Sequence, residues 1–367
     1  MARQAAGIAT RGLGWFGLQP LAQAFLDRTE MHLGQNLVAV AAQVGGHLAP
    51  VVFRLGEKTV SPYSVAPWAE ETLGPGLPPL LHTLRGDFFC APFGGNGTPW
   101  RGERHPPHGE TANANWSLDA FEKSDSRVTL HASLATTVRK GRVDKFLSLV
   151  AGHTAVYSRH VLSGMRGPMS LGHHAMLKFP EVPGSGAVST SRFVRGQVLP
   201  MHFEQPENFG YSALKPGAMF RSLKKVALAT GGVTDLSSYP ARKGYDDLVM
   251  MTADVTLPFA WSAVVRAAEG TVWFALRDPR VLRHTILWMS NSGRHYAPWN
   301  GRHSAVMGIE EVTGCFHLGL AESVQPNALS AAGLPTTVRL NPKKPTTVNY
   351  IMAVAAVPKG FDRVAEI

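Results

Sequence analysis

The sequence predicts an all-β protein, a large antiparallel β-sandwich of two sheets. Runs rich in β-branched and aromatic residues recur along the chain, and Val128, Leu130, Ala132 and Leu134 alternate with polar neighbours. The 37 Gly and 26 Pro residues are scattered between these runs as turn signals, and helical periodicity is nearly absent. So many strands in 367 residues require two packed layers, because twisted sheets split as strands accumulate.

The expected strands follow one another at short intervals, in segments enriched in Val, Ile, Thr, Phe and Trp. They are residues 128–134, 146–150, 254–266, 271–276, 285–289 and 346–357. Turn clusters at residues 164–168, 183–186 and 231–232 separate them. Two short helices are expected, at residues 20–32 and 327–332.

No linker-like stretch or internal repeat divides the chain. We therefore expect one sandwich domain at residues 36–367 behind an N-terminal extension at residues 1–35. Apolar runs end well before the 18 residues that suggest a membrane helix. Gly14, Gly17 and Pro20 interrupt what would be the apolar region of a signal peptide. A cytoplasmic location without a membrane partner is expected.

Composition narrows the class of partner. The apolar share of 44% and the lack of charge blocks exclude wholesale disorder. The net charge is +10, but the basic residues are dispersed, so no nucleic-acid partner is expected. The charge fits either a soluble cationic surface or an anionic ligand in a cleft. Two cysteines, Cys90 and Cys315, form neither a disulfide framework nor a paired metal motif.

The segment of residues 84–116 carries the densest chemistry. Glycines that allow close approach of a ligand stand beside Arg85, Asn96 and His108, and beside the aromatic residues Trp100 and Trp116. Aromatic faces and fixed polar groups together are typical of sugar sites. The alternative is a surface loop whose charged side chains are simply solvated.

Motifs in this segment and beyond resemble the aldose 1-epimerase, or galactose mutarotase-like, superfamily, including its hexose-6-phosphate epimerase branch. The resemblance covers residues 38–357, nearly the whole chain. The motifs are, in order, Arg85-Gly86, Pro92-Phe93-Gly94, His108-Gly109 with Trp116, Leu171-Gly172-His173-His174, Tyr245-Asp246-Asp247, and Gly308-Ile309-Glu310-Glu311 with Pro326-Asn327-Ala328. Glu110-Thr111-Ala112 departs from the Phe-Ala-Arg often found in the family, which removes an Arg associated with phosphosugars.

The resemblance implies a reaction as well as the sandwich fold. Anomer exchange takes a proton from the C1 hydroxyl and delivers one to the ring oxygen, which a carboxylate and an imidazole can do together. Glu310 takes the place of the base at O1 and His174 that of the acid at O5. His108 would polarise the same region, and Asp246 and Arg85 would orient hydroxyls. No metal or organic cofactor is implied.

Several assignments have a neighbour that competes, because side chains alternate along a strand. Glu311, His173 and Asp247 compete with Glu310, His174 and Asp246. A metal site formed by histidines is a further alternative, although adjacent strand residues point to opposite faces. Its candidate ligands are His153, His160, His173 and His174. Arg85 suits a structural salt bridge as well as a ligand contact.

A second polar and aromatic cluster, residues 291–303, precedes the Glu310 segment. Trp299 and Trp288 are candidates for stacking on a sugar, and Arg302 and Arg294 for pairing with an anionic group. An ordinary loop packed by Trp299 is the alternative.

Two functions follow from these observations. The first is an isomerase that exchanges the anomers of a monosaccharide or a modified, even acidic, aldose, acting as a monomer or a homodimer. The second is a carbohydrate-binding or carbohydrate-cleaving protein on the same fold, since a fold does not fix an activity. Only the first needs an imidazole and a carboxylate to converge in one cavity.

Overall fold

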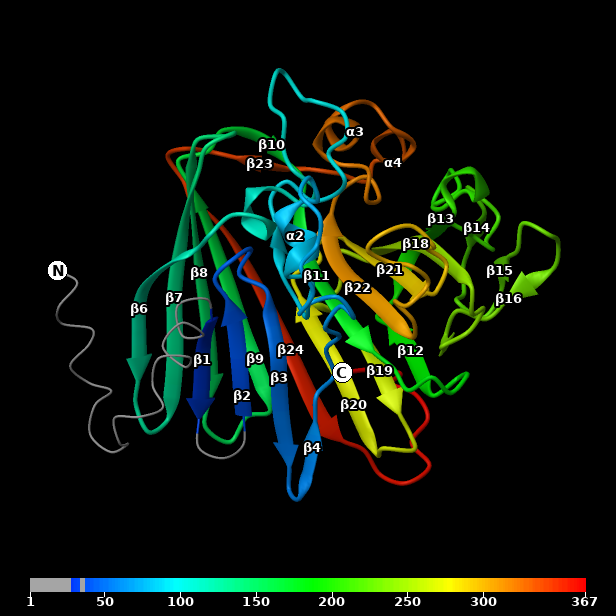
Figure 1. The fold of residues 1–367 in the computed structure, drawn as a ribbon, viewed down its shortest axis with the longest axis horizontal. Helices are drawn as coiled ribbons and strands as arrows, with labels where there is room; N and C mark the ends of the chain where they lie inside the picture. Colours follow the sequence, from blue (N-terminus) through cyan, green and yellow to red (C-terminus); the bar gives the residue numbers. More distant parts are fainter. Residues whose placement is uncertain (1–27, 34–36) are drawn as a thin grey trace.

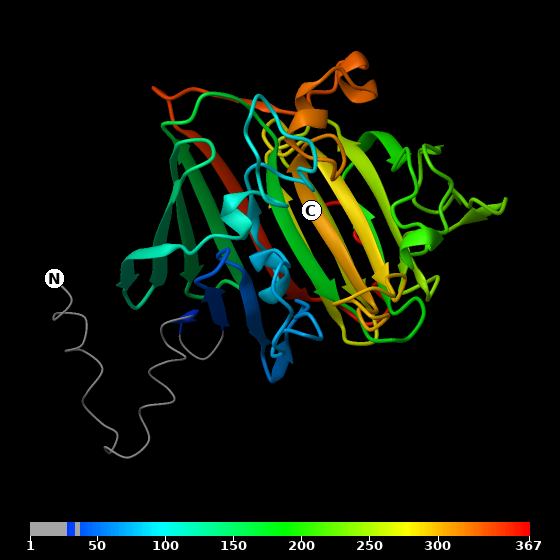
Figure 2. The same ribbon diagram turned by 45° about the horizontal axis from the view of Figure 1, so that its top comes forward.

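The computed structural model describes residues 28–33 and 37–367. Two large antiparallel sheets pack face to face, which confirms the expected two-sheet sandwich (Figures 1 and 2). A smaller N-terminal sheet lies beside the large one, where β1 contacts β7 and β8. Among the described residues, no helix has both the length and the apolar character needed to cross a membrane.

The larger sheet has nine strands within the described residues, in the order β17-β12-β19-β20-β24-β9-β8-β7-β6. These strands are Ser238–Tyr239 (β17), Gly186–Thr190 (β12), Ala260–Arg266 (β19), Thr271–Arg277 (β20), Thr346–Ala356 (β24), Ala155–Ser163 (β9), Gly141–Val150 (β8), Arg127–Thr136 (β7) and Ser117–Lys123 (β6).

The second sheet has seven strands in the described chain, in the order β14-β13-β18-β21-β22-β11-β5. These are Met219–Phe220 (β14), Phe193–Val198 (β13), Tyr245–Ala253 (β18), His284–Asn291 (β21), Val306–Thr313 (β22), Leu171–Lys178 (β11) and Phe89–Cys90 (β5). This sheet carries the candidate site.

Short elements complete the described fold. The N-terminal sheet contains Arg28–Leu33 (β1), Leu37–Ala42 (β2), Leu48–Leu55 (β3) and Lys58–Val60 (β4). Two two-stranded sheets contain Gly167–Met169 (β10) with Val338–Leu340 (β23), and Val226–Ala227 (β15) with Val233–Thr234 (β16). The α-helices are Pro79–His82 (α2), Leu320–Val324 (α3) and Ala328–Ala331 (α4), and the 3₁₀ turns are Glu110–Ala112 (η2) and Pro206–Asn208 (η3).

Both faces of the seven-stranded sheet are buried. Its inner face packs on the larger sheet, with Leu287 and Ile309 in the core between the sheets. Its outer face forms a second apolar cluster, with Ile286, Trp288 and Val312, under the loops that cover it. Because side chains alternate along each strand, neighbouring residues of β21 and β22 serve these two different environments.

The structure confirms the expected strands, but one of them begins later than expected and one expected helix is wrong. The strand expected at residues 254–266 begins at Ala260, because the carboxylate of Asp254 accepts bonds from the backbone and hydroxyl of Thr256 and closes a turn. The helix expected at residues 20–32 is wrong over its described part, since β1 there pairs with β2. Strand pairing therefore begins inside the expected N-terminal extension, and residues 1–27 lie outside the described part.

The helix expected at residues 327–332 is confirmed as α4. The side chain of Asn327 accepts bonds from the backbone N–H groups of Leu329 and Ser330, and the Ser330 hydroxyl in turn bonds the Asn327 backbone. This reciprocal cap offsets the cost of starting so short a helix.

Candidate active site

A cavity of about 270 Å³ opens on the outer face of the seven-stranded sheet. Its charged and imidazole side chains come from well-separated parts of the chain, namely His108, His174, Glu204, Arg294, Glu310 and His317. Aliphatic residues at and beside α2 line one wall, and aromatic residues line another. The cavity is thus a mainly apolar chamber with a small set of convergent polar groups, as small-molecule sites are.

Glu310 and His174 meet at this cavity because of strand register. β11 and β22 are antiparallel partners, and His174 lies directly opposite Glu310. Directly opposed residues of an antiparallel pair lie on the same face of the sheet. The Nε2 atom of His174 is 3.3 Å from Oε1 of Glu310, and both side chains are buried.

Their neighbours in sequence occupy the opposite face. His173 bonds through Nδ1 to the carboxylate of Asp87 at 2.8 Å, and its ring stacks on Tyr350. Glu311 pairs with Arg277 between the two sheets. The structure therefore places Glu310 and His174 at the cavity, and Glu311 and His173 in the layer between the sheets.

Burial sets the protonation of the Glu310–His174 pair. It raises the pKa of Glu310 to about 8, against a smaller opposing effect of Arg294. It lowers the pKa of His174 to about 3. Near pH 7 the pair therefore holds one exchangeable acidic proton, on Glu310, while the imidazole is neutral. Moving this proton to His174 gives the ionised form of the same pair.

The raised pKa of Glu310 predicts a pH-dependent stability that Glu310→Gln removes. Between pH 6.5 and 7.5 the native carboxyl holds a proton that the unfolded chain has released, so the free energy of unfolding falls as pH rises. The expected slope is about 1.4 kcal/mol per pH unit relative to the variant. The lowered pKa of His174 makes stability rise with pH mostly below this window, and both proteins share this contribution, so it cancels in the comparison. Urea unfolding of both proteins at the two pH values measures the slope, and parallel curves would contradict it.

His108 reaches the cavity from the loop before η2. Its backbone is left-handed, with φ of 59°, which non-glycine residues rarely adopt, and its N–H donates to the carbonyl of Gly94 at 2.7 Å. Its ring lies edge-on to that of His174, with 5.0 Å between centroids, and its Nδ1 is 3.5 Å from the thiol of Cys90. Burial holds the pKa of His108 well below its usual value, so the ring is neutral.

Aromatic rings surround Arg294, which lines the cavity. The guanidinium of Arg294 lies 4.4 Å from the ring centre of Trp299, 4.9 Å from Phe203 and 5.1 Å from Trp288. Its Nε bonds Oε1 of Glu204 at 2.7 Å. Burial raises the pKa of Glu204, and the charge of Arg294 opposes this shift. Trp299 therefore lines the cavity and also packs the loop that bears Arg294.

Four residues that the sequence assigned to the substrate do not line the cavity. Arg85 is buried, and its Nε donates to the carbonyl of Thr83. Arg302 forms a two-fold pair with Glu71 near the surface.

Asp246 lies beneath the cavity, where it accepts bonds from the backbone of Gly293 and the indole of Trp288. Asp246 thus holds the loop that carries Arg294, whereas its neighbour Asp247 accepts from Ala213 and Leu214 on the other side.

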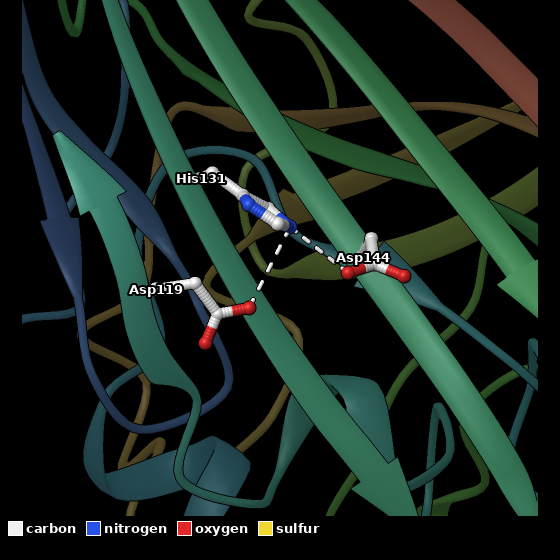
Figure 3. A group of neighbouring side chains, drawn as sticks. All are labelled: Asp119, His131 and Asp144. Carbon is white, nitrogen blue, oxygen red and sulfur yellow. Dashed lines mark hydrogen bonds and ion pairs between the residues drawn. The ribbon is translucent and has the colours of Figure 1, made fainter. Parts of the chain in front are cut away.

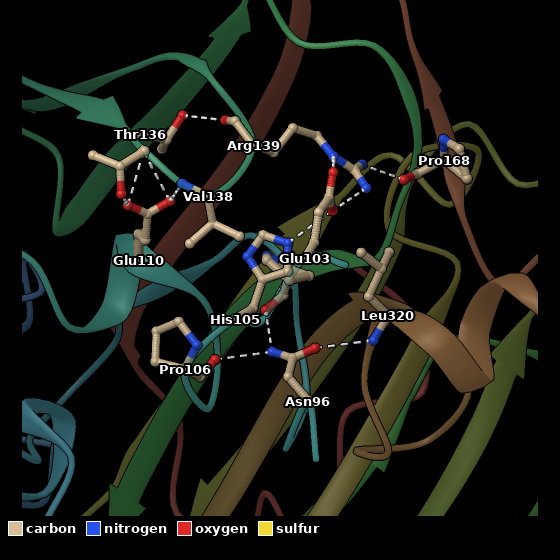
Figure 4. Close-up of polar contacts among 12 residues, drawn as sticks. Asn96, Glu103, His105, Pro106, Glu110, Thr136, Val138, Arg139, Pro168 and Leu320 are labelled. Carbon is tan, nitrogen blue, oxygen red and sulfur yellow. Dashed lines mark hydrogen bonds and ion pairs between the residues drawn. The ribbon is translucent and has the colours of Figure 1, made fainter. Parts of the chain in front are cut away.

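Asn96 is the fourth, and it fastens loops together (Figure 4). Its amide donates to the carbonyls of Pro92, Gly94 and Pro106, and its oxygen accepts from the N–H of Leu320 at the start of α3. The surrounding loop is fixed further by the Arg139–Glu103 ion pair.

Glu110 begins the segment Glu110-Thr111-Ala112, which stands where the resembling family often has Phe-Ala-Arg. Its side chain has a structural role. Its carboxylate accepts from the backbone N–H groups of Thr137 and Val138. These bonds anchor η2, directly after His108, to the turn between β7 and β8.

Replacing Asn96 with Ala is therefore expected to destabilise the fold by about 1–3 kcal/mol, since buried polar groups of the loop lose their partners. Chemical denaturation measures this effect. Ligand affinity should change little once the folded fraction is equal. A large loss of affinity with unchanged stability would instead show that Asn96 contacts the substrate.

Glu204 and His317 line the cavity but were not singled out from the sequence. Glu204 lies in an irregular segment without strand periodicity, 90 positions from its partner Arg294. His317 follows β22 by a turn, and burial lowers its pKa to about 4. The aromatic and basic composition of residues 291–303 was the only signal that pointed to this side of the cavity.

One group of side chains in the described part of the chain has atoms close enough to share a metal ion, namely Asp119, His131 and Asp144 (Figure 3). It lies on the large sheet and includes none of the four histidines considered from the sequence. Arg142 bonds both carboxylates, at 2.6 and 3.0 Å, and so supplies the positive charge that an ion would bring. The group is thus explained as a surface ion-pair network.

Several solved structures with the same architecture are described as epimerases or as mutarotase-related proteins. They include a proposed aldose 1-epimerase from Klebsiella pneumoniae, with 14% identity, a TM-score of 0.62, and coverage of 89% of this chain and 78% of that one. An aldose epimerase homologue from Caenorhabditis elegans has 12% identity and a TM-score of 0.57, with coverage of 90% and 99%. A galactose mutarotase related enzyme from Lactobacillus acidophilus has 10% identity and a TM-score of 0.55, with coverage of 90% and 99%.

The sequence itself matches no protein-family model and no curated protein. The structural likeness shows that the chain has the galactose mutarotase-like sandwich fold, which the motifs had led us to expect. The chemistry of the cavity has to be argued from its own residues.

Proposed function

We propose that this protein is an isomerase that interconverts the anomers of a cyclic sugar, with Glu310 and His174 as its acid/base pair. The contact between these two side chains inside the cavity is the observation that carries the proposal. A carboxyl and an imidazole on one face are the two groups that the reaction needs. The fold shared with epimerase-like proteins supports the same reaction class.

The pair holds the single proton that the reaction consumes and returns. In the ionised form, Glu310 takes the proton of the C1 hydroxyl and His174 donates one to the ring oxygen, as the family resemblance implies. The C1–O5 bond then breaks, C1 becomes an aldehyde, and O5 becomes a hydroxyl. Rotation about C1–C2 and closure on the other face of the aldehyde return both protons.

The electrostatics of the cavity favour the reverse starting roles. Burial leaves the proton on Glu310 and His174 neutral, so Glu310 starts as the acid and His174 as the base. Both assignments are compatible with the reaction, because opening and closing require each group to act in both roles. His108 and His317, both neutral, can bond the sugar hydroxyls at the same end of the cavity.

Exchange NMR on a panel of reducing sugars tests the proposal. The purified protein is expected to speed α/β exchange of at least one sugar well above the rate in buffer. Exchange at the buffer rate across the panel, together with detectable binding, would instead identify a carbohydrate-binding protein.

A further inference from the structure

The cavity lacks polar partners over most of its wall. Pro78, Leu80, Leu81 and Leu84 form one side of it. The other side presents Leu248 and the aromatic residues already described. Among the described lining residues, the hydrogen-bonding side chains are the two acid/base residues, the neighbouring histidines, the Glu204–Arg294 pair, and the indoles of Trp288 and Trp299, of which Trp288 already donates to Asp246. A sugar hydroxyl against the α2 wall would therefore lose its water without gaining a partner.

The charge of the cavity does not suit an anionic sugar. Among the lining residues that the structure describes, Arg294 is the only arginine or lysine, and it is already paired with Glu204 at 2.7 Å and lies 3.5 Å from Asp246. Aromatic rings lie within 5.1 Å of its guanidinium. The histidines of the lining are neutral because burial lowers their pKa values. A phosphate or carboxylate would lie near the carboxyl groups of Glu204 and Asp246, and these groups already neutralise the charge of Arg294.

The exocyclic carbon connects these two observations. The methyl group of a 6-deoxyhexose is the only substituent of the ring without a hydrogen-bonding atom. It is therefore the one substituent that can lie against the apolar wall without leaving an oxygen unbonded. A methyl group there gains apolar contact, whereas the oxygen of a hydroxymethyl group against the same wall loses its water without gaining a partner.

We propose that the substrate is a neutral 6-deoxyhexose, whose methyl group lies against the Leu80–Leu81–Leu84 wall. This proposal rests on the proposed function and specifies its substrate class. It replaces the acidic aldose that the loop arginines suggested from the sequence alone, because the structure pairs both Arg294 and Arg302 with carboxylates.

Sugars that differ only at C6 test it. Exchange NMR compares D-galactose with 6-deoxy-D-galactose, D-glucose with 6-deoxy-D-glucose, and L-mannose with 6-deoxy-L-mannose, so ring stereochemistry cancels within each pair. In the pairs that the enzyme accepts, kcat/KM is expected to be at least tenfold higher for the deoxy sugar, which corresponds to about 1.4 kcal/mol. Galacturonate and galactose 6-phosphate should be at least a hundredfold slower than 6-deoxy-D-galactose.

A wall variant connects the preference to the named residues. Leu81→Asn offers a hydrogen-bond partner and should reduce the deoxy preference at least threefold, whereas Leu81→Ala removes bulk without adding a polar group and should retain it. The Leu81 carbonyl that accepts from the indole of Trp68 is backbone and is kept in both variants.

The outcomes separate the substrate class from the reaction. Equal or faster exchange of the parent hexoses, or of the anionic sugars, overturns the deoxy proposal and leaves the isomerase intact. No exchange of any sugar overturns the isomerase. In that case saturation-transfer NMR decides the ligand class: tighter binding of the deoxy members supports it, and binding without preference, or none, overturns it as well.

Discussion

Glu310→Gln is expected to slow anomer exchange by about 10²–10⁴-fold, the usual contribution of one acid/base group. The amide keeps the volume of the carboxyl but cannot take up or release a proton near pH 7. The only polar contact of the Glu310 carboxyl among the described residues is with His174, so the substitution deprives no other group of a hydrogen-bond partner. The variant should therefore fold, and above pH 6.5 it should be more stable than the wild type, because burial penalises the native carboxylate.

Exchange NMR of the wild type, Glu310→Gln, His174→Gln and the double variant measures this effect. The double variant should be no slower than the slower single variant, since residues that act as one unit do not contribute additively. Asp119→Asn, in the surface network of the other sheet, is the matched control and should exchange normally. If Glu310→Gln retained exchange within about threefold of the wild type, Glu310 would not be part of the reaction.

The sequence predicts strands best where one face meets solvent. β7 alternates between buried and more exposed positions, and the period-two pattern of residues 128–134 follows from that difference. β22 is buried at every position, so hydrophobicity cannot distinguish its two faces. The choice of Glu310 over Glu311 could therefore come only from motif resemblance, until the register of β11 against β22 placed them.

Pairing over long sequence separations was the part that could not be predicted. Arg302 and Glu71 are 231 positions apart, and Arg294 and Glu204 are 90 apart. An arginine in a turn-rich loop has the same local sequence whether it binds a substrate or a carboxylate of its own chain. The same reason applies to Asn96, whose amide suits a sugar hydroxyl as well as the three carbonyls that it bonds here.

Glu311→Gln, one position further along β22, is expected to destabilise the fold by about 3–5 kcal/mol, whereas Glu310→Gln is expected to stabilise it. Oε2 of Glu311 lies 2.5 Å from Nη1 of Arg277, and its carboxylate also accepts from the hydroxyls of Ser262 and Thr285. Both charged side chains are essentially inaccessible to water. The amide would leave the guanidinium without its counter-charge and would turn an N–H group toward donors that need an acceptor.

Urea unfolding at pH 7 measures this cost, with Glu310→Gln as the control for the same chemical change on the other face. A further variant, Arg277→Met with Glu311→Leu, should recover much of the lost stability, because replacing both members of a buried ion pair leaves no isolated charge. A Glu311→Gln protein as stable as the wild type would show that water or a rearranged partner satisfies Arg277. The expected pair of results assigns the two adjacent carboxyls to separate tasks: the one in the cavity carries proton exchange at a cost in stability, and the one between the sheets holds the two layers together.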